Sequence, residues 1–363
     1  MIPFMNLSRQ YEQHKEEFLA AIQAVCEKTA FSGGPFVQTF EEEFAGYTDT
    51  KAAAGVSNGT TALQLALIAL GVRAGDEVII PANTFIATAW AAVYVGAIPV
   101  FVDCSADTWN IEPEQVEKAI TKKTKAIMGV HLYGQPFDID ALRDIAKRHK
   151  LFLLEDCAQA HGATYKGKVI GGLSDVGCFS FYPGKNLGAY GEAGAVVSQN
   201  EELIAHIQRL KNHGQSKQYH HDEIGFNMRM EGIQAAILSC KLKYISKWSE
   251  RRQNIAKNYL ENINNNKIQL PALMDGVESV WHLFVVMADN RDKFLDYMKE
   301  RGIFCGQHYP IPCHLQKAFS HLGYSKGDIP NAENLAASCV SLPMFPELTD
   351  DEVSCVIDAV NSY

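Results

Sequence analysis

The chain has 363 residues, 47% of them apolar, and a formal net charge of −9. This length and apolar content predict one large domain with a smaller one attached. The acidic balance argues against a general surface for nucleic acid or anionic membranes. The 9 cysteines are scattered and show no CxxC spacing, which is typical of a reduced, cytoplasmic protein with neither a disulfide framework nor a zinc site.

One stretch, residues 78–102, carries no charge and is long enough to span a bilayer. However, Pro81, Asn83 and Gly96 are spaced like turns between a strand, a helix and a second strand. The N-terminus also lacks the basic and apolar regions of a signal peptide. The sequence therefore predicts no membrane partner.

In the first two thirds of the chain, short apolar runs alternate with amphipathic stretches. After an N-terminal helix over about residues 7–28, the expected strands are 52–56, 77–80, 99–102, 126–130, 151–154, 176–181 and 195–198. The expected helices between them are 60–70, 84–95, 113–120, 139–149 and 201–210. Such alternation predicts an α/β fold with a mostly parallel sheet and helices on both faces.

The pattern changes after about Gly214. A loop rich in Gln and His leads into a long predicted helix, 232–262, and later helices are expected near 291–301 and 349–362 around apolar runs. We therefore expect a large domain over residues 1–230 and a smaller C-terminal α+β domain over residues 231–363.

A lysine on a turn and an aspartate at a strand end carry the first chemical indication. Lys185 follows a strand-like run and the turn Pro183-Gly184, and Asp156 ends the apolar run 151–154. A pyridoxal phosphate (PLP) enzyme needs such a pair, an amine for the Schiff base and an acid for the pyridinium nitrogen. Either residue alone would be read as a surface lysine or a loop cap. The glycine-rich stretch 187–194 would let a ligand approach the backbone.

Other residues could complete such a site. Gly59 and Thr60 follow a strand and open a helix, whose free N–H groups form a seat for one phosphate, although an ordinary helix cap has the same pattern. Ser180 could add a hydroxyl to that seat, and Gln159 could reach the ring oxygen. Phe85 could stack on a flat ring, although core packing is its default role. The histidines near residue 213 have no metal-binding spacing, so no metal is expected.

Four motifs in order resemble the nucleotide-sugar aminotransferases of the DegT/StrS type, which have the PLP-dependent aspartate aminotransferase fold (fold type I). The resemblance covers nearly the whole chain, and the motifs are Ser57-Asn58-Gly59-Thr60-Thr61-Ala62-Leu63, Glu155-Asp156-Cys157-Ala158-Gln159-Ala160-His161-Gly162, Phe179-Ser180-Phe181-Tyr182-Pro183-Gly184-Lys185-Asn186-Leu187-Gly188 and Gly225-Phe226-Asn227-Met228-Arg229-Met230.

The resemblance implies a role for each matching residue. Lys185 would hold PLP covalently in one half of the reaction and release it as pyridoxamine phosphate (PMP) in the other. The remaining cofactor contacts implied are Asp156 with the pyridinium nitrogen, Gln159 with the ring oxygen, Phe85 stacked on the ring, and Gly59, Thr60 and Ser180 with the phosphate. In the family, the residue matching Asn227 reaches the phosphate from the neighbouring subunit, which implies a homodimer with a shared active site.

The flanks of Lys185 are most similar to family members that aminate C3 of a dTDP-linked 3-keto-6-deoxyhexose. The expected reaction takes an amino-acid donor, with L-glutamate preferred, and yields a dTDP-3-amino-3,6-dideoxyhexose for glycans such as O-antigen or for natural products. Residues expected near the substrate are Tyr182, Lys217, Arg229, His308, Tyr309 and His314.

Three alternatives stay open at this point. Amination could occur at C4, or the enzyme could be a sugar dehydratase of the same fold. Dehydratase relatives carry histidine where this chain has Lys185, so transamination is favoured. A non-catalytic PLP- or sugar-binding regulator on the same scaffold is the third alternative, because a fold does not determine a function.

Overall fold

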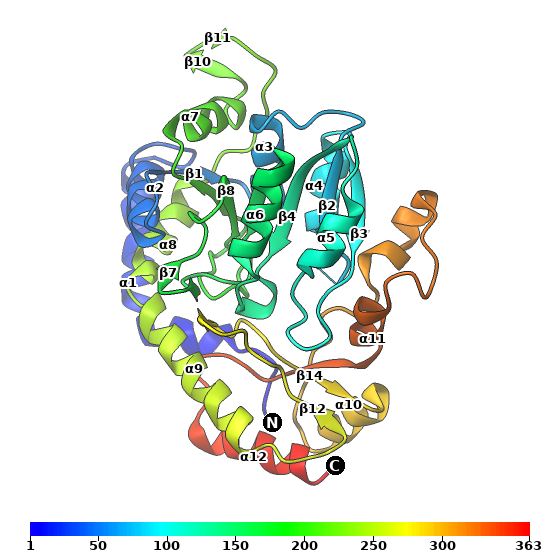
Figure 1. Cartoon of the computed structure of the whole chain (residues 1–363). Helices are drawn as coiled ribbons and strands as arrows, with labels where there is room; N and C mark the ends of the chain where they lie inside the picture. The colour runs from blue at the N-terminus through cyan, green and yellow to red at the C-terminus, as the bar shows by residue number, and fades with distance from the viewer.

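The computed structural model describes all 363 residues, and a seven-stranded sheet forms its centre (Figure 1). The strand order is β1-β9-β8-β5-β4-β2-β3, and β9 is antiparallel to both of its neighbours while the other four pairings are parallel. The mostly parallel sheet is therefore confirmed. Its strands are β1 Ala52–Val56, β2 Glu77–Pro81, β3 Ile98–Val102, β4 Thr124–Val130, β5 Phe152–Asp156, β8 Val176–Ser180 and β9 Gly194–Ser198.

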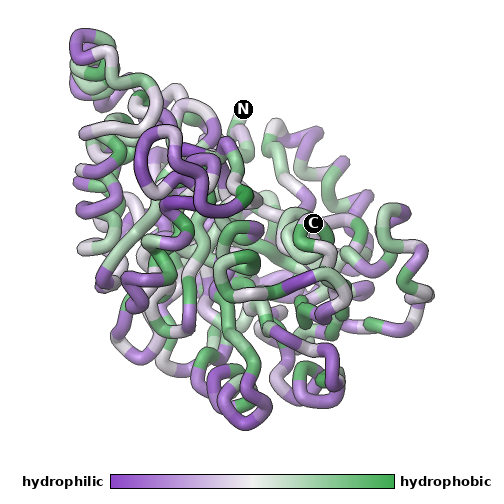
Figure 2. The backbone as a smooth tube through the Cα atoms, turned by 90° about the horizontal axis from the view of Figure 1, so that it is seen from above, coloured by the Kyte–Doolittle hydropathy of each residue, from purple (hydrophilic) through white to green (hydrophobic).

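Helices cover both faces of this sheet because its strands carry apolar side chains on both sides. Ile80 packs into a cluster with helices α3, α4 and α7, whereas Ile79 points the other way into a cluster with α2, α5, α6 and α8. Apolar segments accordingly lie toward the middle of the molecule and hydrophilic turns at its rim (Figure 2). These helices are α2 Pro35–Tyr47, α3 Gly59–Ala69, α4 Ala87–Tyr94, α5 Pro113–Ala119, α6 Ile139–His149, α7 Glu201–Leu210 and α8 Gly232–Leu242.

The second part of the chain builds a smaller, three-stranded antiparallel sheet in the order β12-β14-β15, with its own core. Its elements are α9 Ile245–Asn262, β12 Ile268–Gln269, β14 Phe284–Ala288, α10 Arg291–Glu300, α11 Pro330–Ser338, β15 Cys339–Leu342 and α12 Asp350–Asn361. Short elements complete the fold: β6 Thr164–Tyr165, β7 Lys168–Val169, β10 Gln215–Lys217, β11 His220–His221, β13 Val277–Glu278 and three 3-10 turns at Leu132–Gly134, Cys313–Leu315 and Lys317–Leu322.

Two segments, the N-terminus and α8, do not pack with the unit to which their position in the sequence would assign them. Ile2 pairs with Ile303, and Arg9 forms an ion pair with Glu352, so the N-terminal residues and the start of helix α1 (Leu7–Glu27) lie against the C-terminal region. Conversely, α8 packs on α1 and α2. The division at 230/231 stays a prediction, but the packing associates α8 with the first unit.

Two sequence expectations about helices were wrong. The single helix predicted over 232–262 is interrupted at Lys243 and Tyr244, because α8 packs on α1 and α2 while α9 lies against α12. Helix α2 was not predicted from the sequence. Pro35 occupies the first turn of this helix, where its missing N–H leaves no hydrogen bond unmade.

The uncharged stretch 78–102 forms β2, α4 and β3 of the central sheet layer. No helix in the structure combines the length and the apolar character that crossing a membrane requires.

Candidate active site

A cavity of about 730 Å³ opens at the carboxyl ends of the central strands. Strand β1 is antiparallel to β9 and β9 to β8, so β1 and β8 end at the same edge as β2, β4 and β5. Open α/β sheets bind ligands at this edge. The cavity lining accordingly includes one residue at or just after the end of each of these strands: Gly59, Thr84, Leu132, Asp156 and Ser180.

Asp156 lies at the base of the cavity with only 4% of its surface exposed. Its Oδ1 accepts a 3.1 Å hydrogen bond from the backbone N–H of Ala158, and its Oδ2 accepts a 2.9 Å bond from the Thr88 hydroxyl. Burial nevertheless raises the pKa of Asp156, while these two donors and the Lys185 ammonium oppose the rise. A cation placed beside Asp156 would therefore favour its ionised form.

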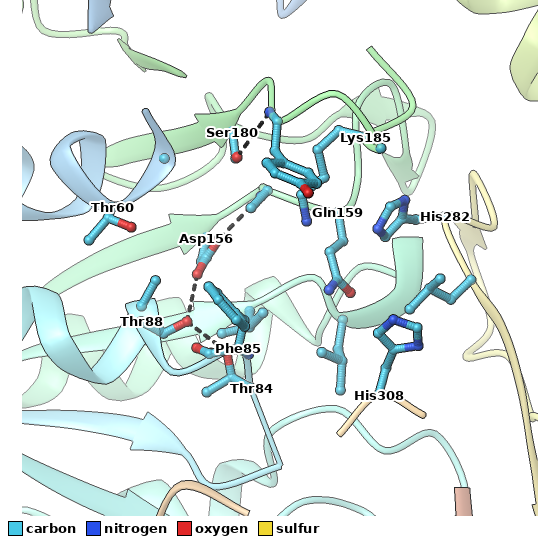
Figure 3. Close-up of a pocket in the computed structure, with 18 of the residues that line it drawn as sticks. Thr60, Thr84, Phe85, Thr88, Asp156, Gln159, Ser180, Lys185, His282 and His308 are labelled. Carbon is cyan, nitrogen blue, oxygen red and sulfur yellow. Dashed lines mark hydrogen bonds between the residues drawn. The ribbon is translucent and has the colours of Figure 1, made fainter. Parts of the chain in front are cut away.

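Lys185 faces the same cavity from the turn after β8, where its backbone N–H closes the turn on the carbonyl of Tyr182 at 2.8 Å (Figure 3). Burial lowers the pKa of Lys185 to about 8, and Asp156 acts in the opposite direction. An amine with this pKa is available as a nucleophile and proton carrier near neutral pH.

The N-terminus of α3 approaches β8 more closely than any side chain would allow. A Cβ on Gly59 would lie 2.5 Å from the Cβ of Ser180, so only glycine fits there. Asn58 caps the helix by accepting from the N–H of Thr61 at 2.9 Å. The N–H groups of Gly59 and Thr60 precede the first intrahelical bond, and both residues line the cavity together with Ser180. This arrangement suits one phosphate group.

An aromatic ring and an oriented amide line the space between these groups. Phe85 is 54% exposed although it follows a buried strand, and its ring lies 5.8 Å from that of Tyr309. The side chain of Gln159 accepts from the N–H of Tyr133 at 2.7 Å and donates to the Tyr309 hydroxyl at 3.0 Å. A flat ring bound here could stack on the exposed ring of Phe85 and contact the fixed side-chain amide of Gln159.

The structure brings together most of the residues that the sequence indicated. Those lining the cavity are Gly59, Thr60, Phe85, Asp156, Gln159, Ser180, Tyr182, Lys185, His308 and Tyr309. Lys217, Asn227 and Arg229 lie outside it, on the segment between α7 and α8. Lys217 and Asn227 are exposed there, and Arg229 donates to the side chain of Asn212 at 2.9 Å.

His314 is a different case. Its ring is fully buried, its Nε2 lies 3.1 Å from Glu333, and it does not line the cavity. The expectation that His314 donates to a substrate therefore has no geometric support, because a dense polar turn in the sequence does not reveal which side chains point inward.

Sequence reasoning missed several lining residues, among them Phe4, Thr88, Glu192 and His282. Thr88 could have been found from its spacing to Thr84, since the two hydroxyls contact each other. His282, in contrast, stands alone in an apolar run and carried no such indication. His282 and His308 close the cavity on the side away from Asp156 (Figure 3).

The residues present fit a pyridoxal cofactor. The cavity contains an amine, a buried carboxyl whose pKa is raised by burial, and a helix N-terminus held by glycine against a hydroxyl. These are the groups that a pyridine ring with an aldehyde and a phosphate would engage.

Comparison with known proteins agrees with this assignment. A protein of Aneurinibacillus thermoaerophilus named dTDP-3-amino-3,6-dideoxy-alpha-D-galactopyranose transaminase is 44% identical over 363 residues, covering 100% of this chain and 99% of that protein. The crystal structure of DesV from S. venezuelae in complex with a ketimine intermediate has a TM-score of 0.98 and 43% identity, covering 99% and 98% of the two chains. A pleiotropic regulatory protein of Geobacillus stearothermophilus is 42% identical over 365 residues, covering 100% and 98%.

The fold and the site together define an aminotransferase. Residues 12–361 match the DegT/DnrJ/EryC1/StrS aminotransferase family, and the chain belongs to that family.

Proposed function

We propose that the protein transfers an amino group from an amino acid to C3 of a dTDP-linked 3-keto-6-deoxyhexose, with PLP as its cofactor. The observation that carries this proposal is the pairing of the Lys185 amine and the buried Asp156 carboxyl across one cavity. The product would be a dTDP-3-amino-3,6-dideoxyhexose.

Several residues would hold the cofactor. Asp156 would face the ring nitrogen, Phe85 the ring plane, Gln159 the ring oxygen, and the seat formed by Gly59, Thr60 and Ser180 the phosphate. When bound, the cofactor withdraws electrons from the carbon that carries the amino group and so makes its proton acidic. Asp156 supports this by stabilising the positive charge on the ring nitrogen, which is worth about 1.5–3 kcal/mol for a charge-assisted hydrogen bond.

Lys185 would carry the proton. Its Nζ can remove a proton from the donor's Cα and deliver it to a neighbouring carbon, and the sugar half of the reaction uses the reverse transfer. Because burial lowers the pKa of Lys185 to about 8, the amine gives and takes protons near neutral pH without a large energetic penalty in either direction.

The choice of a 3-keto sugar rests on the flanks of Lys185 and on the relative that is 44% identical and is named for amination at C3 of a dTDP-sugar. Tyr182, His308 and Tyr309 line the cavity at positions that suit contacts with the hexose. L-Glutamate is the proposed donor. The product would enter glycans such as O-antigen or natural products.

The test is a panel of 3-keto and 4-keto nucleotide sugars, offered with L-glutamate to the PLP-loaded protein, with products identified by NMR. A C3 amine on the dTDP-6-deoxyhexose is the expected product, and Lys185→Ala is the inactive control. A C4 amine, or loss of a hydroxyl without amination, would replace this proposal with the 4-aminotransferase or the dehydratase.

We infer that the active site is shared between two subunits. Asn227, Lys217 and Arg229 lie outside the cavity of their own chain, and the hairpin β10–β11 beside them projects from the body of the molecule (Figure 1). A second copy could bring this segment to the cavity, where Asn227 would contact the phosphate and Lys217 and Arg229 would offset the charge of the nucleotide.

Mixing two inactive variants tests the shared site. Lys185→Ala and Asn227→Asp each remove one proposed contribution, so a mixed dimer would contain one site with both native residues. After dissociation and reassociation, activity should recover to roughly a quarter of the wild-type value. No recovery, although chromatography shows mixed dimers, would assign both residues to one subunit.

A regulatory role is the second candidate, because a relative that is 42% identical is named a pleiotropic regulatory protein. The panel of keto nucleotide sugars described above distinguishes the regulatory role from the aminotransferase activity. A protein that binds PLP or a nucleotide sugar but shows no turnover with any keto sugar would favour regulation.

We also propose a cytoplasmic location, which the 9 free cysteines support because reduced thiols persist in that compartment. Cell fractionation with an antibody to the protein tests it. Recovery with a membrane or extracellular fraction would argue against it.

A further inference from the structure

His282 lies in the wall of the cavity, just before strand β14 of the smaller sheet, and only 6% of its surface is exposed. Its backbone carbonyl and that of Trp281 accept from one nitrogen of the buried Arg252 guanidinium, at 3.3 and 3.1 Å. The backbone at residue 282 is therefore held in place, and the imidazole projects into the cavity (Figure 3).

A neighbouring amide determines which imidazole nitrogen carries the proton. The Asn186 Nδ2 donates to the carbonyl of Val280 at 3.0 Å, so the Asn186 Oδ1 is the atom that faces His282. That oxygen lies 3.1 Å from the His282 Nδ1 and can only accept. His282 Nδ1 therefore carries the hydrogen, and Nε2 presents a lone pair.

The imidazole is also kept neutral. Burial lowers the pKa of His282 well below its usual range, and the positive charges of Lys185 and Arg252 lower it further. No group of the chain is hydrogen-bonded to Nε2. His282 thus offers the cavity one hydrogen-bond acceptor and no donor.

We propose that the His282 Nε2 accepts a hydrogen bond from a hydroxyl of the keto sugar and thereby favours the sugar over the keto acid left by the donor, which competes for the aminated form in the second half of the reaction. The two carbonyl compounds enter one cavity, and they differ in hydrogen-bonding chemistry. Sugar hydroxyls can donate, whereas the carboxylates of a keto acid accept only. The fixed lone pair on Nε2 attracts a sugar hydroxyl and repels a carboxylate.

This inference rests on the proposed function, and each half-reaction tests it separately. With the PLP-loaded His282→Phe variant, the spectral change on adding L-glutamate should proceed at the wild-type rate or faster, because the lone pair that repels carboxylates is gone. The reverse change, on adding the keto sugar to the aminated form, should be about tenfold slower through weaker sugar binding. Calorimetric binding of the dTDP-amino sugar should weaken by a similar factor.

Two further variants separate recognition from a structural effect. His282→Gln restores an oxygen acceptor and should recover part of the sugar half-reaction. Asn186→Asp places a carboxylate against Nδ1, which favours the doubly protonated imidazole and converts Nε2 into a donor. That variant should bind the sugar more weakly and L-glutamate more tightly than the wild type.

The outcomes distinguish the possible failures. If His282→Phe slows both half-reactions equally, or neither, the proposed recognition is wrong even though the enzyme is an aminotransferase. If the wild-type protein aminates no keto sugar, the proposed function fails instead, and that result is visible before any variant is compared.

Discussion

The hydroxyl of Thr88 donates a 2.9 Å hydrogen bond to Oδ2 of Asp156, and the hydroxyl of Thr84 lies 2.6 Å from that of Thr88. Because the single Thr88 proton points at the carboxylate, Thr84 must donate to Thr88. A chain of donors thus ends at Asp156, the acid proposed to bind the cofactor ring.

Replacing Thr88 with valine should therefore weaken catalysis without removing the acid. The Asp156 carboxylate would lose one of its two neutral donors, so its pKa would rise further and its support of a ring cation would fall. A hydrogen bond to a charged group is worth about 1.5–3 kcal/mol, so kcat should fall at least about tenfold. Thr88→Ser keeps the hydroxyl and is the matched control. Equal activity of the two variants would contradict the role of this bond.

Lys185→Ala should remove both the covalent attachment of PLP and the proton carrier. Turnover should fall by about 10²–10⁴-fold or more, and the visible absorbance of the bound cofactor should change. Steady-state assays and absorbance spectra check this. Lys257→Ala, which removes a lysine on the exposed face of α9, should change neither. Full activity of Lys185→Ala would reject the mechanism.

Another buried lysine, Lys241, should make stability depend on alkaline pH. Its Nζ donates to the carbonyl of Gly188 at 2.8 Å and lies 4.4 Å from the ring centre of Tyr190. Burial lowers the pKa of Lys241 to about 8. Between that value and the unfolded pKa of about 10.4, the unfolded chain binds more protons than the folded one, so this group adds stability as pH rises.

Denaturant unfolding of wild type and Lys241→Met at several pH values would measure this. The free energy of unfolding should shift in favour of the wild type by about 2–3 kcal/mol between pH 8 and 10. Lys257→Met, on the exposed face of α9, is the control and should show no such trend. A constant difference between wild type and Lys241→Met would show that the amine is not perturbed.

The ion pair between Arg9 and Glu352 should make the free energy of unfolding depend on pH in the acidic range. Both terminal guanidinium nitrogens lie 2.6 Å from the carboxylate oxygens. The hydrogen bonds from Arg9 lower the pKa of Glu352 to about 2. A lowered carboxyl pKa contributes stability above the unfolded value of about 4.3, and this contribution is lost as the pH falls toward 2.

Arg9→Met should therefore lower the free energy of unfolding by about 1 kcal/mol at neutral pH, since the pair is partly screened by solvent. The difference should shrink from pH 4.5 to pH 2, as followed by denaturant unfolding. Arg148→Met, which breaks a solvent-exposed pair with Glu117, should lower the free energy of unfolding by less than Arg9→Met does. An unchanged Arg9→Met difference down to pH 2 would contradict the lowered pKa of Glu352.

The parts of the site that could be predicted from sequence are those that depend on local structure. Asp156 and Lys185 each follow a strand, and parallel strands bring their ends to one edge, so their meeting in one cavity could be inferred. The strands themselves were apolar runs bounded by turns, and β1 was predicted with the bounds that the structure has.

The residues that escaped prediction depend on contacts between distant segments. The lone pair of His282 exists only because Asn186, almost a hundred positions away, faces its other nitrogen. The break between α8 and α9 arises from packing, since the apolar periodicity runs through it. Position in the cavity cannot be read from composition either, as the buried His314 illustrates.

The strand-like pairing of Ile2 with Ile303 has a consequence for assembly of the cavity. Phe4, two residues further on, stacks on His308 with ring centres 5.4 Å apart, and both residues line the site. Pairing Ile2 with Ile303 closes a loop that comprises most of the chain. Such a closure carries an entropic penalty and slows folding. We therefore expect this wall of the cavity to form late, after the central sheet that carries Asp156 and Lys185.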